Sequence, residues 1–129
     1  LLYCRNCTKD TVFIPQIYRS FIRPISAHHL HKQLSDKERE QYFTVYLDKF
    51  FSPFQSQKIW EFSHPLPADD QLTRHASLEW EAQEVTLVNG FEGSFDCTLF
   101  GKAYFSIVPE NKDKNFYSWF PLYFSFKEE

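Results

Sequence analysis

Residues 94–108 read Ser-Phe-Asp-Cys-Thr-Leu-Phe-Gly-Lys-Ala-Tyr-Phe-Ser-Ile-Val, the clearest structural pattern in the chain. Apolar and polar side chains alternate along this stretch, which is typical of a long strand with one face on a core. Residues 76–88 alternate in the same way but slip near Glu84, as they would at a β-bulge. Residues 116–126 form a third β-prone stretch, rich in aromatic side chains. Three successive strands with short connections predict an antiparallel meander that curls along its length.

Two shorter stretches extend this expectation toward the N-terminus. Residues 16–22 and 58–62 are rich in β-branched and aromatic side chains, and each predicts a further strand. Gly101 stands inside the long stretch at 94–108, where we expect the strand to bend.

One main amphipathic helix is predicted over about residues 36–51. Ser35 is a favourable N-cap, and Glu38 follows it at the spacing of a capping box. Pro53 disfavours helical geometry at the residue before it, so the helix should end there. Large apolar side chains recur at spacings of three and four, which places them on one helix face. These are Phe43, Tyr46, Leu47 and Phe50. The predicted fold class is therefore α+β: a curved antiparallel sheet of three to four long strands packed around one helix.

The chain length predicts a single domain. The 129 residues are enough for one hydrophobic core. Residues 1–10 are polar around two cysteines and are expected to form an irregular lead-in. The sequence starts at Leu1 and contains no methionine, so we expect a domain excised from a longer or processed chain.

Composition narrows the classes of function. The formal net charge is −3, so no basic excess is available for nucleic-acid phosphates, and no nucleic-acid partner is expected. No apolar run approaches 18 residues, so contact with a membrane would need a segment outside this chain. Gly-x-Ser-x-Gly, Walker and Rossmann motifs are absent, so we expect a protein that is not an enzyme.

Two cysteines have the spacing of half a zinc site, because Cys4 and Cys7 form a Cys-x-x-Cys pair. Cys97, His28 and His31 are the candidates for the remaining ligands. A disulfide between the pair, or free thiols, explains the same residues. Cys97 also fits a small core residue. The sequence requires no cofactor, and zinc is the one that it leaves open.

Aromatic residues make up 19% of the chain, and this excess is its most unusual feature. They gather in residues 50–54 and 116–126. The predicted interaction residues are Tyr117, Trp119, Tyr123 and Phe54. The first three alternate along the last strand, opposite a core-facing set that includes Phe120 and Phe124. Such a face suits a protein interface, a cover for a loop or helix end, or a pocket for a small ligand.

The order of elements resembles a known family. An extended segment at 12–15, a capped helix ending at 46–53, and long strands closing on 123–126 are arranged as in the periplasmic domains of VirB8- and TraE-type components of type IV secretion systems. The resemblance implies a nuclear-transport-factor-2-like fold, tethering by a membrane helix outside this chain, and a scaffold that contacts other subunits. It also implies an extracytoplasmic location, periplasmic or secreted.

The sequence therefore predicts a non-enzymatic protein-interaction or assembly domain. Its expected partners are other protein subunits, including further copies of the same chain. One alternative is a small-molecule or lipid carrier with an apolar cavity between sheet and helix. The other is a zinc-stabilised binding domain.

Overall fold

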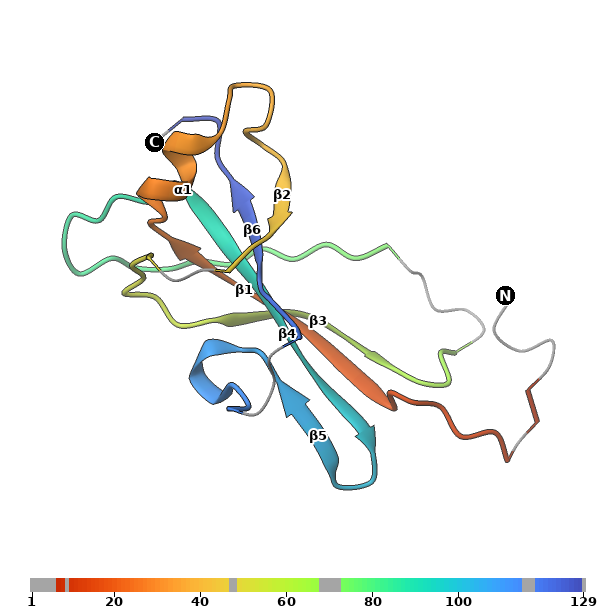
Figure 1. Ribbon diagram of the computed structural model, residues 1–129. Coiled ribbons are helices and arrows are strands. Elements are labelled where there is room, and N and C mark those ends of the chain that lie inside the picture. Colours follow the sequence, from red (N-terminus) through yellow and green to blue (C-terminus); the bar gives the residue numbers. More distant parts are fainter. Residues whose placement is uncertain (1–6, 9, 47–48, 68–72, 115–117, 129) are drawn as a thin grey trace.

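The computed structural model describes residues 7–8, 10–46, 49–67, 73–114 and 118–128. Its strands and helices follow one another along the chain as Figure 1 shows. They are β1 (Ile17–Ile25), α1 (His28–Gln33), β2 (Tyr42–Thr44), β3 (Gln57–Ser63), β4 (Gly90–Phe100), β5 (Ala103–Ser106), the short 3-10 helix η2 (Pro109–Asn111) and β6 (Leu122–Ser125).

The described strands form one antiparallel sheet in the order β2-β6-β4-β1-β3. Strand β4 lies at its centre and pairs with β1 along nine residues on one side. Its other side is shared, because residues 90–93 pair with β6 and residues 96–100 pair with β5. The sheet therefore divides at β4, with β6 and β2 running one way and the β4–β5 hairpin the other (Figure 1).

The helix predicted over residues 36–51 is wrong in the part that the structure describes, which leaves out Leu47 and Asp48, and the α+β fold class is wrong with it. Half of the capping box forms, since the Ser35 amide donates to Glu38 Oε2 at 2.9 Å, and the Ser35 hydroxyl donates to the same oxygen at 2.6 Å. Only a turn follows, because Glu40 adopts a positive φ of 64°. The next residues, Tyr-Phe-Thr, form β2 against β6. Aromatic and β-branched residues favour a strand, and pairing with β6 outweighs the local helix signal.

The other predicted strands are confirmed in part. Strands β1 and β3 include residues 17–22 and 58–62, as expected. The long strand at 94–108 is divided into two, because Gly101 has a φ of 55° and turns the chain between β4 and β5. Residues 76–88 form no strand, and the last strand begins only at Leu122 within the described residues. The meander of three long strands is therefore replaced by a sheet of mostly short strands.

The buried core lies at the end of the sheet where α1, β2 and β6 meet. Ile25, Ala27 and Tyr123 are fully enclosed there. Half-buried apolar residues pack around them: Leu30, Leu34, Phe43, Val45 and Phe50. No helix of the described residues is both long and apolar enough to cross a membrane.

Candidate interaction surface

Charged side chains from β1, β3 and β4 meet on one face of the sheet. Arg19 donates from Nε to Glu61 Oε2 at 2.8 Å and from Nη1 to Asp96 Oδ1 at 3.0 Å. Arg23 donates from Nε to Glu92 Oε2 at 2.6 Å. The strand register explains these contacts, because Arg19 lies opposite Asp96 and Glu61, and Arg23 lies opposite Glu92. The face is thus held by ion pairs between neighbouring strands.

Most of this charged face is buried, although Glu61 on the edge strand β3 is exposed. Glu92 is only 4% exposed, and burial raises its pKa despite the opposing effect of Arg23. The hydrogen bond from Arg19 instead lowers the pKa of Glu61. Asp96 also accepts a hydrogen bond from the Tyr104 hydroxyl at 3.1 Å. Because each carboxylate is held by a cation or a hydroxyl, the arrangement suits structural support.

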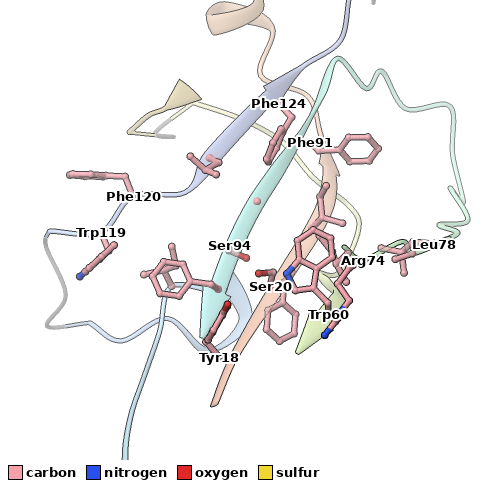
Figure 2. A pocket seen from close by; sticks show the side chains of 18 of the residues that line it. Tyr18, Ser20, Trp60, Arg74, Leu78, Phe91, Ser94, Trp119, Phe120 and Phe124 are labelled. Atoms are coloured by element: carbon pink, nitrogen blue, oxygen red, sulfur yellow. The ribbon is translucent and has the colours of Figure 1, made fainter. Parts of the chain in front are cut away.

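The opposite face of the sheet is aromatic and open. It forms a groove of about 1110 Å³. Four strands supply its floor: Tyr18, Ser20 and Ile22 from β1, Trp60 from β3, Phe91 and Phe95 from β4, and Leu122 and Phe124 from β6. Figure 2 shows Trp119 and Phe120 on one side of this floor and Trp60, Arg74 and Leu78 on the other. We call this surface the aromatic groove.

The walls of the aromatic groove are built from ring contacts. Trp119 is 50% exposed, and its ring lies edge-on to Phe95 with centroids 5.5 Å apart. On the opposite wall the Arg74 guanidinium lies 4.7 Å from the centroid of the Phe62 ring, as in a cation–π contact. A concave surface of this kind can bury apolar or aromatic groups of a partner.

The exposed rings continue from the aromatic groove onto β2. Tyr46 meets Phe120 edge to face with centroids 5.9 Å apart, and Tyr42 lies 6.1 Å from Phe124. Both tyrosines are mostly exposed. The aromatic surface therefore reaches the edge of the sheet.

The predicted interaction residues are not brought together as a set. Trp119 lines the aromatic groove, whereas Phe54 is half-buried outside its lining. Tyr117 lies outside the described residues. The surface position expected for Tyr123 is wrong, because its side chain is fully buried and its hydroxyl donates to the Asn89 carbonyl at 2.9 Å. Phe124, expected in the core, lines the groove instead.

The predicted metal ligands that the structure describes lie on different elements of the fold. Cys4 is outside the described residues, and Cys7 belongs to the N-terminal segment. Cys97 lies buried in β4, where desolvation raises the pKa of its thiol. His28 and His31 are on α1, and His31 Nε2 donates to the Phe126 carbonyl at 3.0 Å. Among the described residues no three of His, Cys, Asp and Glu gather as a metal site would need. The zinc site stays a prediction, since its first cysteine is not described.

The sequence interpretation missed the groove floor because it assumed that the apolar face of each strand is the inner one. A signal for the opposite arrangement was present. Arg19 and Arg23 are spaced by four along β1, and Glu92 and Asp96 are spaced by four along β4. Matching charges at matching spacing predict a cross-strand ladder between the two strands.

Comparison with known proteins identifies relatives over nearly the whole chain. The family model described as the PRMT5 oligomerisation domain matches residues 17–129. Protein arginine N-methyltransferase 5 of Oryza sativa subsp. indica is 33% identical over 92% of this chain, which corresponds to 20% of that relative. Protein arginine N-methyltransferase skb1 of Schizosaccharomyces pombe is 29% identical over 91% of this chain and 22% of its own length. The Xenopus laevis protein arginine N-methyltransferase 5 is 30% identical over 92% of this chain and 20% of its own length.

These matches overturn the resemblance to VirB8- and TraE-type domains. The nuclear-transport-factor-2-like fold, the membrane-associated complex and the periplasmic or secreted location rested on that resemblance, and they are wrong with it. The relatives are arginine methyltransferases of rice, fission yeast and frog. The chain spans about one fifth of the length of these relatives. The prediction of an interaction domain agrees with the match, and the chain belongs to the family of PRMT5 oligomerisation domains.

Proposed function

We propose that this chain is a non-catalytic domain of a protein arginine methyltransferase, and that it joins copies of the enzyme into an oligomer. The family match supports self-association, and the names of the relatives supply the enzyme class. The family match carries the proposal of self-association. The open aromatic face of the sheet, opposite the largely buried charged face, supports a second contact surface. Among the described residues the charged side chains of the strands form ion pairs with one another. A partner would therefore contact the sheet mainly by apolar packing.

An open aromatic groove on a small domain calls for a covering partner, because large exposed apolar patches mark interaction sites. The matched region is 20% of the rice relative, so four fifths of that protein lie outside it. We assign the aromatic groove to this remaining polypeptide, the methyltransferase part. The domain would then hold the enzyme on one surface and use another for its neighbours.

The chain contains its own reporter for the groove. All three of its tryptophans, Trp60, Trp80 and Trp119, line the aromatic groove. Acrylamide should quench their fluorescence in the domain alone and quench it several-fold less in a protein that includes the methyltransferase part. Equal quenching in both proteins would remove the assignment of the groove.

Self-association is tested directly by sedimentation velocity over about 1 to 100 μM, the range of moderate protein affinities. We expect a sedimentation coefficient that rises with concentration. A monomer throughout this range would overturn the proposed oligomerisation. Methyl transfer to an arginine-containing peptide by the domain alone would overturn its non-catalytic role.

A small-molecule or lipid carrier is the second candidate function, and the size of the groove favours it. Ligand pockets commonly enclose about 300–1,000 Å³, close to the volume found here. An apolar fluorescent probe should then bind with one-to-one saturation and accept energy from the tryptophans. Binding without saturation would remove this candidate.

A further inference from the structure

In the part of the chain that the structure describes, the strand order β2-β6-β4-β1-β3 ends in two strands that each have one unpaired side, and β5, which lies off this order, pairs only with β4. Within the described residues, β2 pairs only with β6, and β3 pairs only with β1. An unpaired edge presents backbone donors and acceptors to any strand that approaches it. The two edges differ in how they are protected.

Strand β3 carries the usual protection of an edge. Lys58 and Glu61 place opposite charges on it, 3.3 Å apart. The pairing with β1 also shifts near Ile59, which marks a bulge. Charges and bulges both discourage further pairing, so β3 is a poor template for another strand.

Strand β2 has none of these features. Residues 41–46 read Gln-Tyr-Phe-Thr-Val-Tyr and contain no charge, proline or glycine. Such uncharged segments of β-prone residues are the ones that pair readily with other strands. An edge of this composition is expected to be covered in the assembled protein.

The backbone of β2 is oriented for pairing. The Gln41 carbonyl accepts from the Ser125 amide at 3.1 Å, and the Val45 amide donates to the Pro121 carbonyl at 3.3 Å. Gln41 and Val45 therefore direct their backbone groups toward β6. In an antiparallel pair these orientations alternate, so every second residue between them points the other way. The amides and carbonyls of Tyr42 and Thr44 thus face outward from the sheet.

We propose that β2 pairs with β2 of a second copy, antiparallel and about a two-fold axis at Thr44. The inference rests on the proposed self-association and names the surface that performs it. Because a two-fold axis normal to the sheet keeps each face on its own side, the two copies form one continuous sheet. Tyr42 then lies opposite Tyr46 of the second copy, Phe43 opposite Val45, and Thr44 opposite Thr44.

This register places favourable pairs at every position. Aromatic–aromatic, aromatic–β-branched and Thr–Thr neighbours all stabilise antiparallel strands. The register also keeps core-facing residues opposite core-facing residues of the second copy. Phe43 and Val45 pack toward the core, whereas Thr44 lines the aromatic groove. The register centred on Phe43 would instead set Glu40 against Tyr46, a charge beside an aromatic ring.

The exposed tyrosines give the contact its size. Tyr42 is 68% and Tyr46 is 75% exposed. With about 150–250 Å² for each aromatic side chain, scaled by these exposed fractions, the four tyrosines of a pair contribute at most about 400–700 Å². A standard stable interface buries about 1,600 Å² in total. This area is less than half of a standard interface, so we expect a weak and reversible pairing.

The test uses Thr44, which is exposed and lies on the proposed axis. In Thr44→Lys, two like charges face each other across the axis, and the same holds for Thr44→Glu. We expect each variant to raise the dissociation constant at least about tenfold in sedimentation experiments. An equimolar mixture of the two variants should restore association, because Lys then faces Glu. Thr73→Lys, an exposed position away from β2, is the matched control and should associate like the wild type.

The outcomes separate this inference from the proposed function. A wild type that associates while both Thr44 variants associate equally well would overturn the β2 pairing alone. Loss of association in each variant without rescue by mixing would overturn the two-fold register at Thr44. A monomeric wild type would overturn the self-association itself. Circular dichroism of each variant verifies that the fold is retained.

Discussion

On one face of the sheet the Arg23–Glu92 pair is almost fully enclosed, whereas on the other Trp119 keeps half of its surface exposed. The usual distribution of polar and apolar side chains is reversed in this comparison. Buried charges are tolerated only when paired, and here the register supplies a partner for each. The aromatic face stays open, so the difference teaches that the domain covers its own paired charges and leaves its aromatic side chains at the surface.

The largest effect is expected from removing one side of the enclosed ion pair. Arg23→Met leaves the Glu92 carboxylate buried beside an apolar chain, and such losses cost about 3–5 kcal/mol of unfolding free energy. Urea denaturation measures the change. Lys58→Met is the control, since Lys58 is exposed and its pair with Glu61 should contribute no more than about 1 kcal/mol. Equal effects of the two substitutions would mean that the charged face is not truly buried.

The next effect compares two glycines of β4 where β6 crosses it. A Cβ at Gly90 would overlap the buried Tyr123 ring and lie 2.5 Å from the Phe124 carbonyl oxygen. A Cβ at Gly93 would lie 2.7 Å from Cε2 of the Phe124 ring, which lines the open groove and has space to move. Overpacking costs about 1–3 kcal/mol, so Gly90→Ala should lie near the upper limit and Gly93→Ala near the lower. Thermal denaturation of both variants checks the order, and the reverse order would contradict this assignment of the faces.

The smallest effect is a dependence of stability on pH. Burial raises the pKa of Glu92 above its ordinary value of 4.5, so the folded state binds the proton more tightly than the unfolded chain. The free energy of unfolding should therefore fall as pH rises from 4.5 through the folded pKa. Glu61 acts in the opposite sense, since its pKa is lowered and its stabilising contribution is lost as pH falls below 4.5. Glu61 is more exposed, so solvent screening reduces its part.

Glu92→Gln isolates this effect. The unfolding free energy of the wild type minus that of the variant should decrease as pH rises above 4.5, because only the wild type has a carboxyl group at this position to lose a proton. Denaturant titrations at successive pH values measure that difference. A constant difference would show that the Glu92 carboxylate is solvated.

Sequence reasoning succeeded where the signal was local to one strand. The β-prone residues of β1 and β3 identified those strands, and the predicted bond from the Ser35 amide to the Glu38 carboxylate does form. It failed where a distant partner decided the outcome. The residues around Phe43 have a helical pattern but form a strand, because they pair with β6, which lies some eighty residues later. The burial of Tyr123 depends on Asn89 and on the core around Ile25, and no spacing within β6 reveals either.

The sequence predicts the type of site, an aromatic interaction surface, but not the residues that form its floor. The aromatic excess indicates an interaction domain, and the predicted interaction residue Trp119 lines the aromatic groove. The floor of the groove comes from four strands whose order in the sheet differs from their order in the sequence. Only the matching charge spacing of β1 and β4 carried information across that distance.

The pairing of β1 with β4 has a consequence for synthesis on the ribosome. Their partners are separated by 65 residues at Ile25 and Gly90, and by 81 residues at Ile17 and Thr98. At about 5–20 residues per second, β1 waits roughly 3–16 s for its central partner to be made. During that interval β3 can occupy one side of β1, but the other remains unsatisfied. The central strand of this domain therefore joins the sheet late, and one side of β1 stays unpaired in the nascent chain until β4 has been made.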